Sequence, residues 1–90
     1  MITEQTRSFP IDWTRSQFPA LRKHMGSERV IYLDGPGGTQ VSEKVIHAMT
    51  TYLQTSNSNI GGRFATSVQT SEIVSRARIA LAEFINAYGP

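Results

Sequence analysis

The sequence contains no cysteine and no long apolar run. The first absence excludes a disulfide framework, a cysteine-based zinc site and a cysteine nucleophile within these 90 residues, and it fits a reducing compartment. No apolar run approaches the roughly 20 residues that a membrane-spanning helix needs. The polar segment 1–10 also lacks the apolar centre of a signal peptide, so we expect a cytoplasmic protein with no membrane partner.

An excess of charge of one sign is absent as well. Nine Lys and Arg against seven Asp and Glu give a formal net charge of +2, and the basic residues are scattered along the chain. Because nucleic-acid binding usually needs a basic stripe or cluster, we expect no nucleic-acid partner. The composition, with 39% apolar and 18% charged residues, indicates a folded chain rather than a disordered one.

Hydrophobic periodicity predicts three helices, which follow a flexible N-terminal arm over residues 1–10. The predicted helices lie at about 12–17, 42–54 and 67–87. Pro19 ends the first helix, because proline lacks an N–H donor and disfavours helical backbone at the residue before it. A loose turn should then cover Leu21–Met25, with Gly26 and Ser27 breaking the chain before the next element.

The ends of the longer helices carry capping signals. Ser42 is a suitable N-cap, and Glu43 places a negative charge in the positive first turn of the second helix. Thr66 and Gln69 have the spacing of a capping box at the start of the third helix. The pair Gly89–Pro90 forms a natural stop for that helix.

One short strand is predicted at 29–33, from the apolar run Val30–Leu33. A lone strand has no partner for its backbone N–H and C=O groups, and unpaired buried groups are costly. Either a second strand lies within the loops, or this strand pairs with polypeptide outside these 90 residues.

Two glycine-rich loops are the candidate functional segments. The loop Asp34–Gln40 matches neither the Walker pattern nor G-x-G-x-x-G, and its spacing suits both a plain turn and a ligand loop. We expect the Asp34 carboxylate to bond the backbone N–H groups of the turn. The loop Asn57–Thr66 carries one cation, Arg63, which suits a carboxylate or phosphate ligand but is equally typical of a solvated surface residue.

Other catalytic signals are weak. His47 lies between apolar positions of the second helix and is typical of a surface or partly packed imidazole. Lys23 and Lys44 are the only lysines, and neither lies in the apolar setting of a lysine that attacks carbonyl groups.

The chain nevertheless resembles a known family in several short motifs in one order. These motifs look like the beginning of a class V aminotransferase or cysteine desulfurase, a pyridoxal-phosphate enzyme of fold type I. They are Phe18–Leu21, Val30–Asp34, Thr39-Gln40, Val45–Met49, Asn59, Thr66-Ser67, Glu72, Ala77-Arg78 and Phe84–Ala87. The similarity covers residues 11–88.

The same motifs depart from the desulfurase pattern in two places. Desulfurases usually carry Asn-Ala-Ala-Thr after Leu-Asp, whereas Gly35–Thr39 is closer to the Gly-Pro-Gly loop of alanine–glyoxylate type aminotransferases. The stretch Asn-x-His-Arg-Gly-x-His is here Asn59–Ala65, which retains Asn59 and an arginine but neither histidine. The resemblance is therefore to a desulfurase-like subgroup whose substrate is not evident.

This resemblance implies an α/β fold with a mainly parallel sheet, a pyridoxal phosphate cofactor, an amino-acid substrate and a homodimer. Residues 11–90 would form an N-terminal segment whose partner is the remainder of the enzyme chain. The lysine that forms the Schiff base would lie downstream, so the segment alone should neither hold the cofactor nor be active. The implied substrate-binding residues are Gly35, Pro36, Gly37, Gly38, Thr39, Asn59 and Arg63.

A different class of protein also fits the residues. Two amphipathic helices and little else would suit a small, non-enzymatic interaction module that buries its apolar stripes against a partner. The sequence leaves this alternative open.

Overall fold

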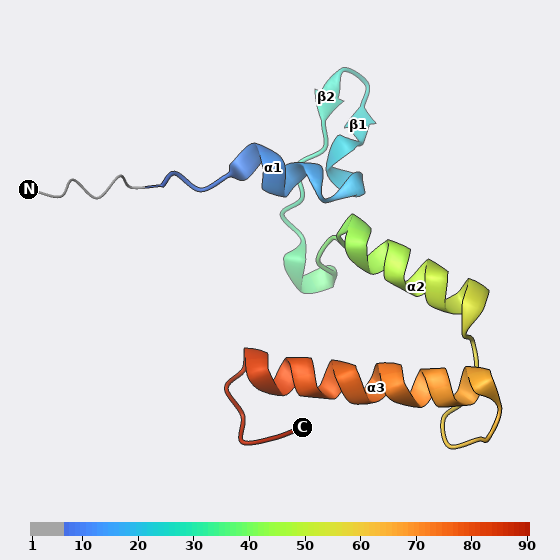
Figure 1. The fold of residues 1–90 in the computed structure, drawn as a ribbon. Helices are drawn as coiled ribbons and strands as arrows, with labels where there is room; N and C mark the ends of the chain where they lie inside the picture. The colour runs from blue at the N-terminus through green and yellow to red at the C-terminus, as the bar shows by residue number, and fades with distance from the viewer. Residues whose placement is uncertain (1–6) are drawn as a thin grey trace, which may run out of the picture. The chain divides into compact units, whose positions relative to one another are not determined.

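The computed structural model describes residues 7–90 and is mostly helical, with one small antiparallel sheet (Figure 1). The elements are α1 (Ile11–Ser16), η1 (Pro19–Arg22), β1 (His24–Met25), β2 (Glu28–Arg29), η2 (Gly35–Gly37), α2 (Glu43–Thr55) and α3 (Ala65–Phe84), where η marks a 3₁₀ helix. The predicted arm falls outside the described residues over positions 1–6, and 7–10 have no regular structure. Two compact units, Met1–His47 and Ala48–Pro90, divide the chain.

The first helix of the first unit confirms its sequence prediction to within one residue. α1 ends at Ser16, and Phe18 adopts an extended conformation with φ −114° and ψ 103° before Pro19. This is the backbone that proline imposes on the residue before it. Proline also suits the start of a helical turn, because its missing N–H would have no partner there, and Pro19 opens η1. The loose turn predicted for Leu21–Met25 is therefore partly 3₁₀ helix.

The strand predicted at 29–33 is largely wrong. β2 covers Glu28–Arg29 and pairs with β1 through a turn at Gly26 and Ser27, where Gly26 has φ 64°. Pairing extends only as far as the bond from the Val30 N–H to the Lys23 carbonyl, at 3.1 Å. The apolar run beyond it stays unpaired within the described residues, because a strand needs a neighbour and not only a β-prone sequence.

The run Val30–Leu33 nevertheless keeps the two-residue alternation of extended chain. Val30 and Tyr32 are half-buried, and the Tyr32 hydroxyl donates to the Ala20 carbonyl at 3.0 Å. Ile31 and Leu33, between and after them, are 79% and 90% exposed. One side of the run thus packs on its own unit, and the other side is uncovered.

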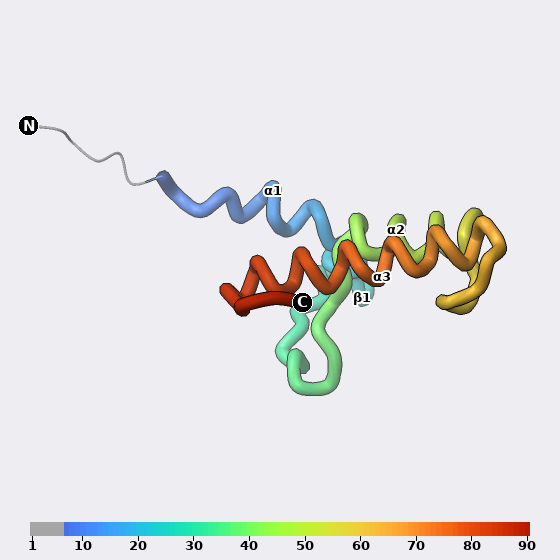
Figure 2. Tube along the Cα trace, turned by 60° about the horizontal axis from the view of Figure 1, so that its bottom comes forward, coloured from blue at the N-terminus to red at the C-terminus, as the bar shows by residue number. Residues whose placement is uncertain are grey.

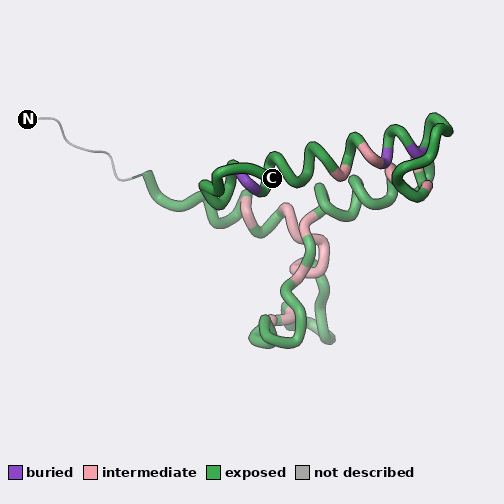
Figure 3. The backbone as a smooth tube through the Cα atoms, turned by 90° about the horizontal axis from the view of Figure 1, so that it is seen from below, coloured by how far each residue is buried: buried purple, intermediate pink, exposed green. Residues whose placement is uncertain are grey.

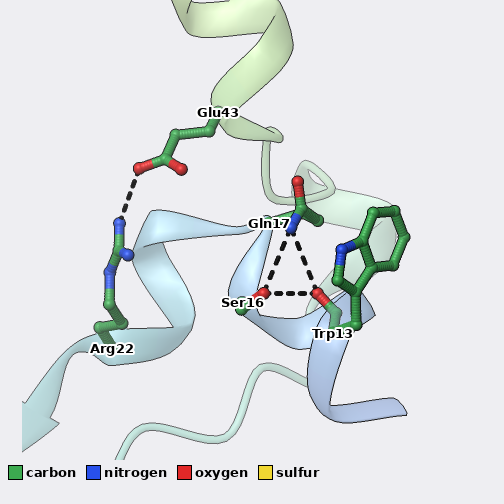
Figure 4. Close-up of polar contacts among 5 residues, drawn as sticks. All are labelled: Trp13, Ser16, Gln17, Arg22 and Glu43. Carbon is green, nitrogen blue, oxygen red and sulfur yellow. Dashed lines mark hydrogen bonds and ion pairs between the residues drawn. The ribbon is translucent and has the colours of Figure 1, made fainter. Parts of the chain in front are cut away.

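Contacts within the first unit hold the start of α2. The Glu43 N–H donates to the Gln17 carbonyl at 2.8 Å, and Glu43 pairs with Arg22 at 3.0 Å between Oε1 and Nη2 (Figure 4). Beside them, the Ser16 hydroxyl donates to the Trp13 carbonyl at 2.6 Å. α2 starts one residue after the predicted N-cap, Ser42, whose carbonyl accepts the first bonds of the helix from Val45 and Ile46.

In the second unit, α3 follows the 56–64 loop as one unbroken helix (Figure 2). It begins two residues earlier than predicted, with Phe64 as N-cap and no side-chain cap, so the capping box at Thr66 and Gln69 is wrong. It also ends before Gly89–Pro90. Asn86, at φ 56°, closes it with bonds from the Asn86 and Ala87 N–H groups to the carbonyls of Glu83 and Ala82. This is a Schellman motif, which asparagine accepts because it tolerates left-handed backbone.

Burial is sparse and concentrated on α3 (Figure 3). Among the described residues the buried positions are Ser67, Thr70 and Ala82, at 3%, 6% and 8% exposure. Apolar side chains that give α2 and α3 their helical periodicity are largely exposed, namely Val45, Ile46, Met49, Leu53, Ile73, Leu81 and Phe84. Two of the three best-buried side chains are therefore polar. No helix in residues 7–90 combines the length and apolarity needed to cross a bilayer.

Candidate functional site

The Gly35–Thr39 loop lies in the first unit, entirely at the surface. Its 3₁₀ turn is closed by bonds from the Gly37 N–H to the Asp34 carbonyl at 2.8 Å and from the Gly38 N–H to the Gly35 carbonyl at 3.0 Å. A Cβ placed on Gly35, Gly37 or Gly38 would meet no atom within 4 Å. Position 38 favours glycine because its backbone has φ 139°, and not because a side chain would lack room there.

The role expected for the Asp34 side chain is wrong. Asp34 precedes η2 as its N-cap residue, but its carboxylate caps no N–H group there. The backbone carbonyl accepts the Gly37 bond instead, because a 3₁₀ turn satisfies that donor by itself. The carboxylate remains exposed beside the loop.

The second loop, 56–64, is held by hydroxyl groups of α3 within the second unit. The Gly62 N–H donates to Ser67 Oγ at 2.8 Å, and the Ser67 hydroxyl donates to the Asn59 carbonyl at 2.6 Å. The Gly61 N–H donates to Ser71 Oγ at 3.3 Å. One buried serine thus accepts and donates a bond at once, so both of its hydrogen-bonding roles are satisfied by the loop.

A second hydroxyl, Thr70, holds the start of the same loop. Thr70 Oγ1 lies 3.0 Å from the Ser56 carbonyl and 2.9 Å from the Thr66 carbonyl, and 3.2 Å from the Tyr52 hydroxyl on α2. The Tyr52 hydroxyl in turn donates to the Ser58 carbonyl at 3.0 Å and lies 3.3 Å from the Ser58 nitrogen. We call Tyr52, Ser67, Thr70 and Ser71 the hydroxyl latch.

The latch also changes the acidity of Tyr52. The Thr70 hydroxyl, followed by the Ser58 N–H, lowers the pKa of Tyr52 below its ordinary value of 10.0, because both stabilise the phenolate; desolvation opposes them and is weaker.

The two polar residues predicted for this loop differ in their surroundings. The Asn59 side chain is used locally, since its Oδ1 accepts the Ile60 N–H at 2.9 Å. Arg63 is exposed, and within residues 7–90 it forms no ion pair; the pair between Arg22 and Glu43 is the one found there. Arg63 is therefore the residue of this loop that presents a free charge to a ligand.

Two surface hollows, one in each unit, are lined by residues other than the predicted site residues. A hollow of about 330 Å³ in the first unit is lined mainly by polar residues, and one of about 480 Å³ in the second unit lies beside α3. Their linings include Arg15, Arg22 and Arg29 in the first case and Ile60, Val74 and Arg78 in the second. Gly35, Pro36, Gly37, Gly38, Thr39, Asn59 and Arg63 lie on exposed loops instead.

Sequence reasoning missed the latch. Its signal is readable in retrospect, because Ser67, Thr70 and Ser71 stand at positions i, i+3 and i+4 and so share one helix face. Hydrophobic periodicity, from which the helices are predicted, registers these residues only as polar positions and does not indicate a contact with the loop.

The match to known sequences covers both loops. The family model described as aminotransferase class-V matches residues 31–89. The chain belongs to the aminotransferase class-V family. This places Gly35–Thr39, Asn59, Arg63 and the latch inside the matched region.

Individual relatives agree with the family match. An aminotransferase-like protein of Gibberella zeae is 39% identical over an alignment of 84 residues, and the match covers 89% of this chain and 20% of that protein. Probable cysteine desulfurases of Vibrio cholerae and Xylella fastidiosa are each 33% identical, over 86% and 84% of this chain and 19% of their own lengths. The chain thus spans about a fifth of the length of the curated relatives it matches.

The residues of this chain do not by themselves fit pyridoxal phosphate. Lys23 and Lys44 are both exposed, so neither offers the enclosed amine that would anchor the cofactor. Gly61 and Gly62, which would suit a phosphate cradle by composition, already donate their N–H groups to serine hydroxyls. We therefore assign no residue of this chain to cofactor binding.

Proposed function

We propose that this chain is the N-terminal portion of a pyridoxal-phosphate-dependent class-V enzyme of fold type I that acts on an amino acid. The observation that carries the proposal is the family match over residues 31–89. The relatives named cysteine desulfurase and aminotransferase-like support the two reaction subtypes. In such an enzyme the cofactor supplies the chemistry, as an electron sink for the bound amino acid.

The part proposed for this chain is to provide loops on the substrate side. Gly35–Thr39 offers exposed backbone with open space around its glycines, and no hydrogen bond within residues 7–90 occupies the Thr39 N–H. Arg63 offers a guanidinium that forms no ion pair within residues 7–90, and such a group recognises a carboxylate with two parallel bonds. The substrate carboxylate is the group that Arg63 would recognise.

The remainder of the enzyme is proposed to cover what this chain leaves exposed. Ile31 and Leu33 form the uncovered side of an extended, mostly unpaired run, which suits an added strand. The apolar faces of α2 and α3 suit the rest of the domain and the interface of a homodimer.

The test is to read the coding sequence past Pro90 and to express the longer polypeptide beside the 90-residue chain. We expect the longer polypeptide to bind pyridoxal phosphate and to turn over an amino acid. The 90-residue chain, treated with pyridoxal phosphate and borohydride, should give no stable lysine adduct that turns over substrate.

Two results would contradict the proposal. A borohydride-trapped, catalytically active 90-residue chain would show that the segment suffices. A reading frame that stops at Pro90, together with a cooperatively folding monomer of that length by light scattering, would favour the interaction module.

A further inference from the structure

The Asn59–Arg63 loop is glycine-rich, yet the middle of its backbone is not available to a ligand. Three consecutive N–H groups have partners inside the unit: Ile60 donates to Asn59 Oδ1, Gly61 to Ser71 Oγ and Gly62 to Ser67 Oγ. A loop that binds anions through its backbone must leave such groups free and convergent. The glycines here serve conformation instead, since Gly61 has φ 84° and Gly62 has no room for a side chain.

The same bonds fix the backbone of Arg63 from both sides. Immediately before it, Gly62 is bonded to the buried Ser67 at 2.8 Å. Immediately after it, Phe64 is the N-cap of α3 and accepts the Val68 N–H at 3.0 Å. The backbone at Arg63 is therefore restrained, while the Arg63 side chain is exposed and forms no ion pair within residues 7–90.

We propose that Ser67 is a positioning residue, which holds the 59–63 loop so that the Arg63 side chain, and not the loop backbone, binds the carboxylate of the substrate. The identity of the anion as the substrate carboxylate rests on the proposed function. The positioning itself does not, because it follows from bonds within Ala48–Pro90.

Restraint of the backbone matters because binding must otherwise order the loop as well as the guanidinium. Ordering one long side chain upon binding weakens affinity by roughly two- to ten-fold, and a mobile loop adds to that cost. Ser67 removes part of this cost in advance. Arg76, an exposed arginine on α3, is a suitable internal reference, since its side chain is exposed and pairs with no acid within residues 7–90.

The experiment uses the 90-residue chain with sodium acetate as the carboxylate probe and follows the arginine Nε–H signals by NMR. We expect acetate to shift the Arg63 signal at several-fold lower concentration than the Arg76 signal. Ser67→Ala should raise the Arg63 midpoint to that of Arg76 and speed amide exchange at Gly61 and Gly62. Ser75→Ala, on the same helix and with no side-chain hydrogen bond within residues 7–90, is the matched control and should change neither.

Ser71→Ala provides a milder variant if Ser67→Ala loses helical signal by circular dichroism. It frees only the Gly61 N–H and should speed exchange there and weaken acetate binding to a smaller degree. Equal midpoints for Arg63 and Arg76 in the unaltered chain would overturn the proposal. So would an Arg63 midpoint that the latch variants leave unchanged. Failure of the longer polypeptide to turn over amino acids would sink the proposed function but not this positioning role.

Discussion

Replacement of Gly62 by alanine should disrupt the hydroxyl latch, because the added methyl group would collide with Ser67. A Cβ at this position would lie 2.8 Å from Ser67 Oγ and 3.2 Å from Ser67 Cβ. Ser67 cannot withdraw easily, because it is 3% exposed and sits on α3. The loop must therefore move, which lengthens the bond from Gly62 to Ser67 and the bond from Ser67 to the Asn59 carbonyl.

The size of the effect follows from those two bonds. An intramolecular hydrogen bond contributes about 1 kcal/mol net, so the loss of both favours loop opening by about 2 kcal/mol. That corresponds to roughly a 30-fold change in the opening equilibrium. Alanine also restricts the unfolded chain, which offsets about 0.4–1 kcal/mol of any unfolding cost.

Amide hydrogen exchange at residues 61 and 62, corrected for intrinsic rates, measures this opening. Gly37→Ala is the matched control, because a Cβ there meets nothing within 4 Å and its φ lies outside the left-handed region. It carries the same unfolded-state effect without the clash, so exchange at residues 61 and 62 should not change. Unaltered exchange in Gly62→Ala as well, with helix content preserved, would refute the contact as the support of the loop.

Other perturbations probe the remaining contacts. Because the pKa of Tyr52 is lower in the folded chain than in the unfolded chain, ionisation of Tyr52 favours folding. The free energy of unfolding should therefore rise as pH increases through the folded-state pKa and reach its full gain above the unfolded-state value near 10. The gain should be lost as pH falls back through the folded-state pKa. Urea unfolding of Tyr52→Phe should lack this rise. Asn86→Ala should destabilise the end of α3 by about 1 kcal/mol, whereas Asn86→Gly should not, as thermal unfolding by circular dichroism would show. Glu43→Gln should cost at most about 1 kcal/mol, because its pairing with Arg22 is solvent-exposed at 3.0 Å, and the cost should shrink in high salt; a larger, salt-independent loss would contradict this assignment.

Helix positions were largely predictable from local sequence. The helices predicted at about 12–17, 42–54 and 67–87 appear as Ile11–Ser16, Glu43–Thr55 and Ala65–Phe84. Hydrophobic periodicity and the effect of Pro19 act over a few neighbouring residues, so both can be predicted from the local sequence. The ends were less predictable. The third helix ends at Asn86, which adopts left-handed backbone, and not at Gly89 three residues later. Both residue types can end a helix in this way, so the local sequence does not choose between them.

The strand and the loop contacts depended on partners distant in sequence. Val30–Leu33 has the composition of a strand but only a short ladder, because hydrogen bonding is decided by what lies beside it. The bond from Ser67 to Asn59 spans eight residues and the one from Thr70 to Ser56 spans fourteen. The local sequence around a helical hydroxyl does not indicate which distant carbonyl will accept its hydrogen bond.

For the candidate site, the sequence by itself determined the family, the order of the two glycine loops and the residue types available to a carboxylate. These are properties of local chemistry and motif order. Only the tertiary structure decided that the N–H groups of Gly61 and Gly62 are bonded to Ser71 and Ser67, whereas the Arg63 side chain keeps a charge that forms no ion pair within residues 7–90. The reason is physical: whether a polar group is available to a ligand depends on which other groups already satisfy it in three dimensions.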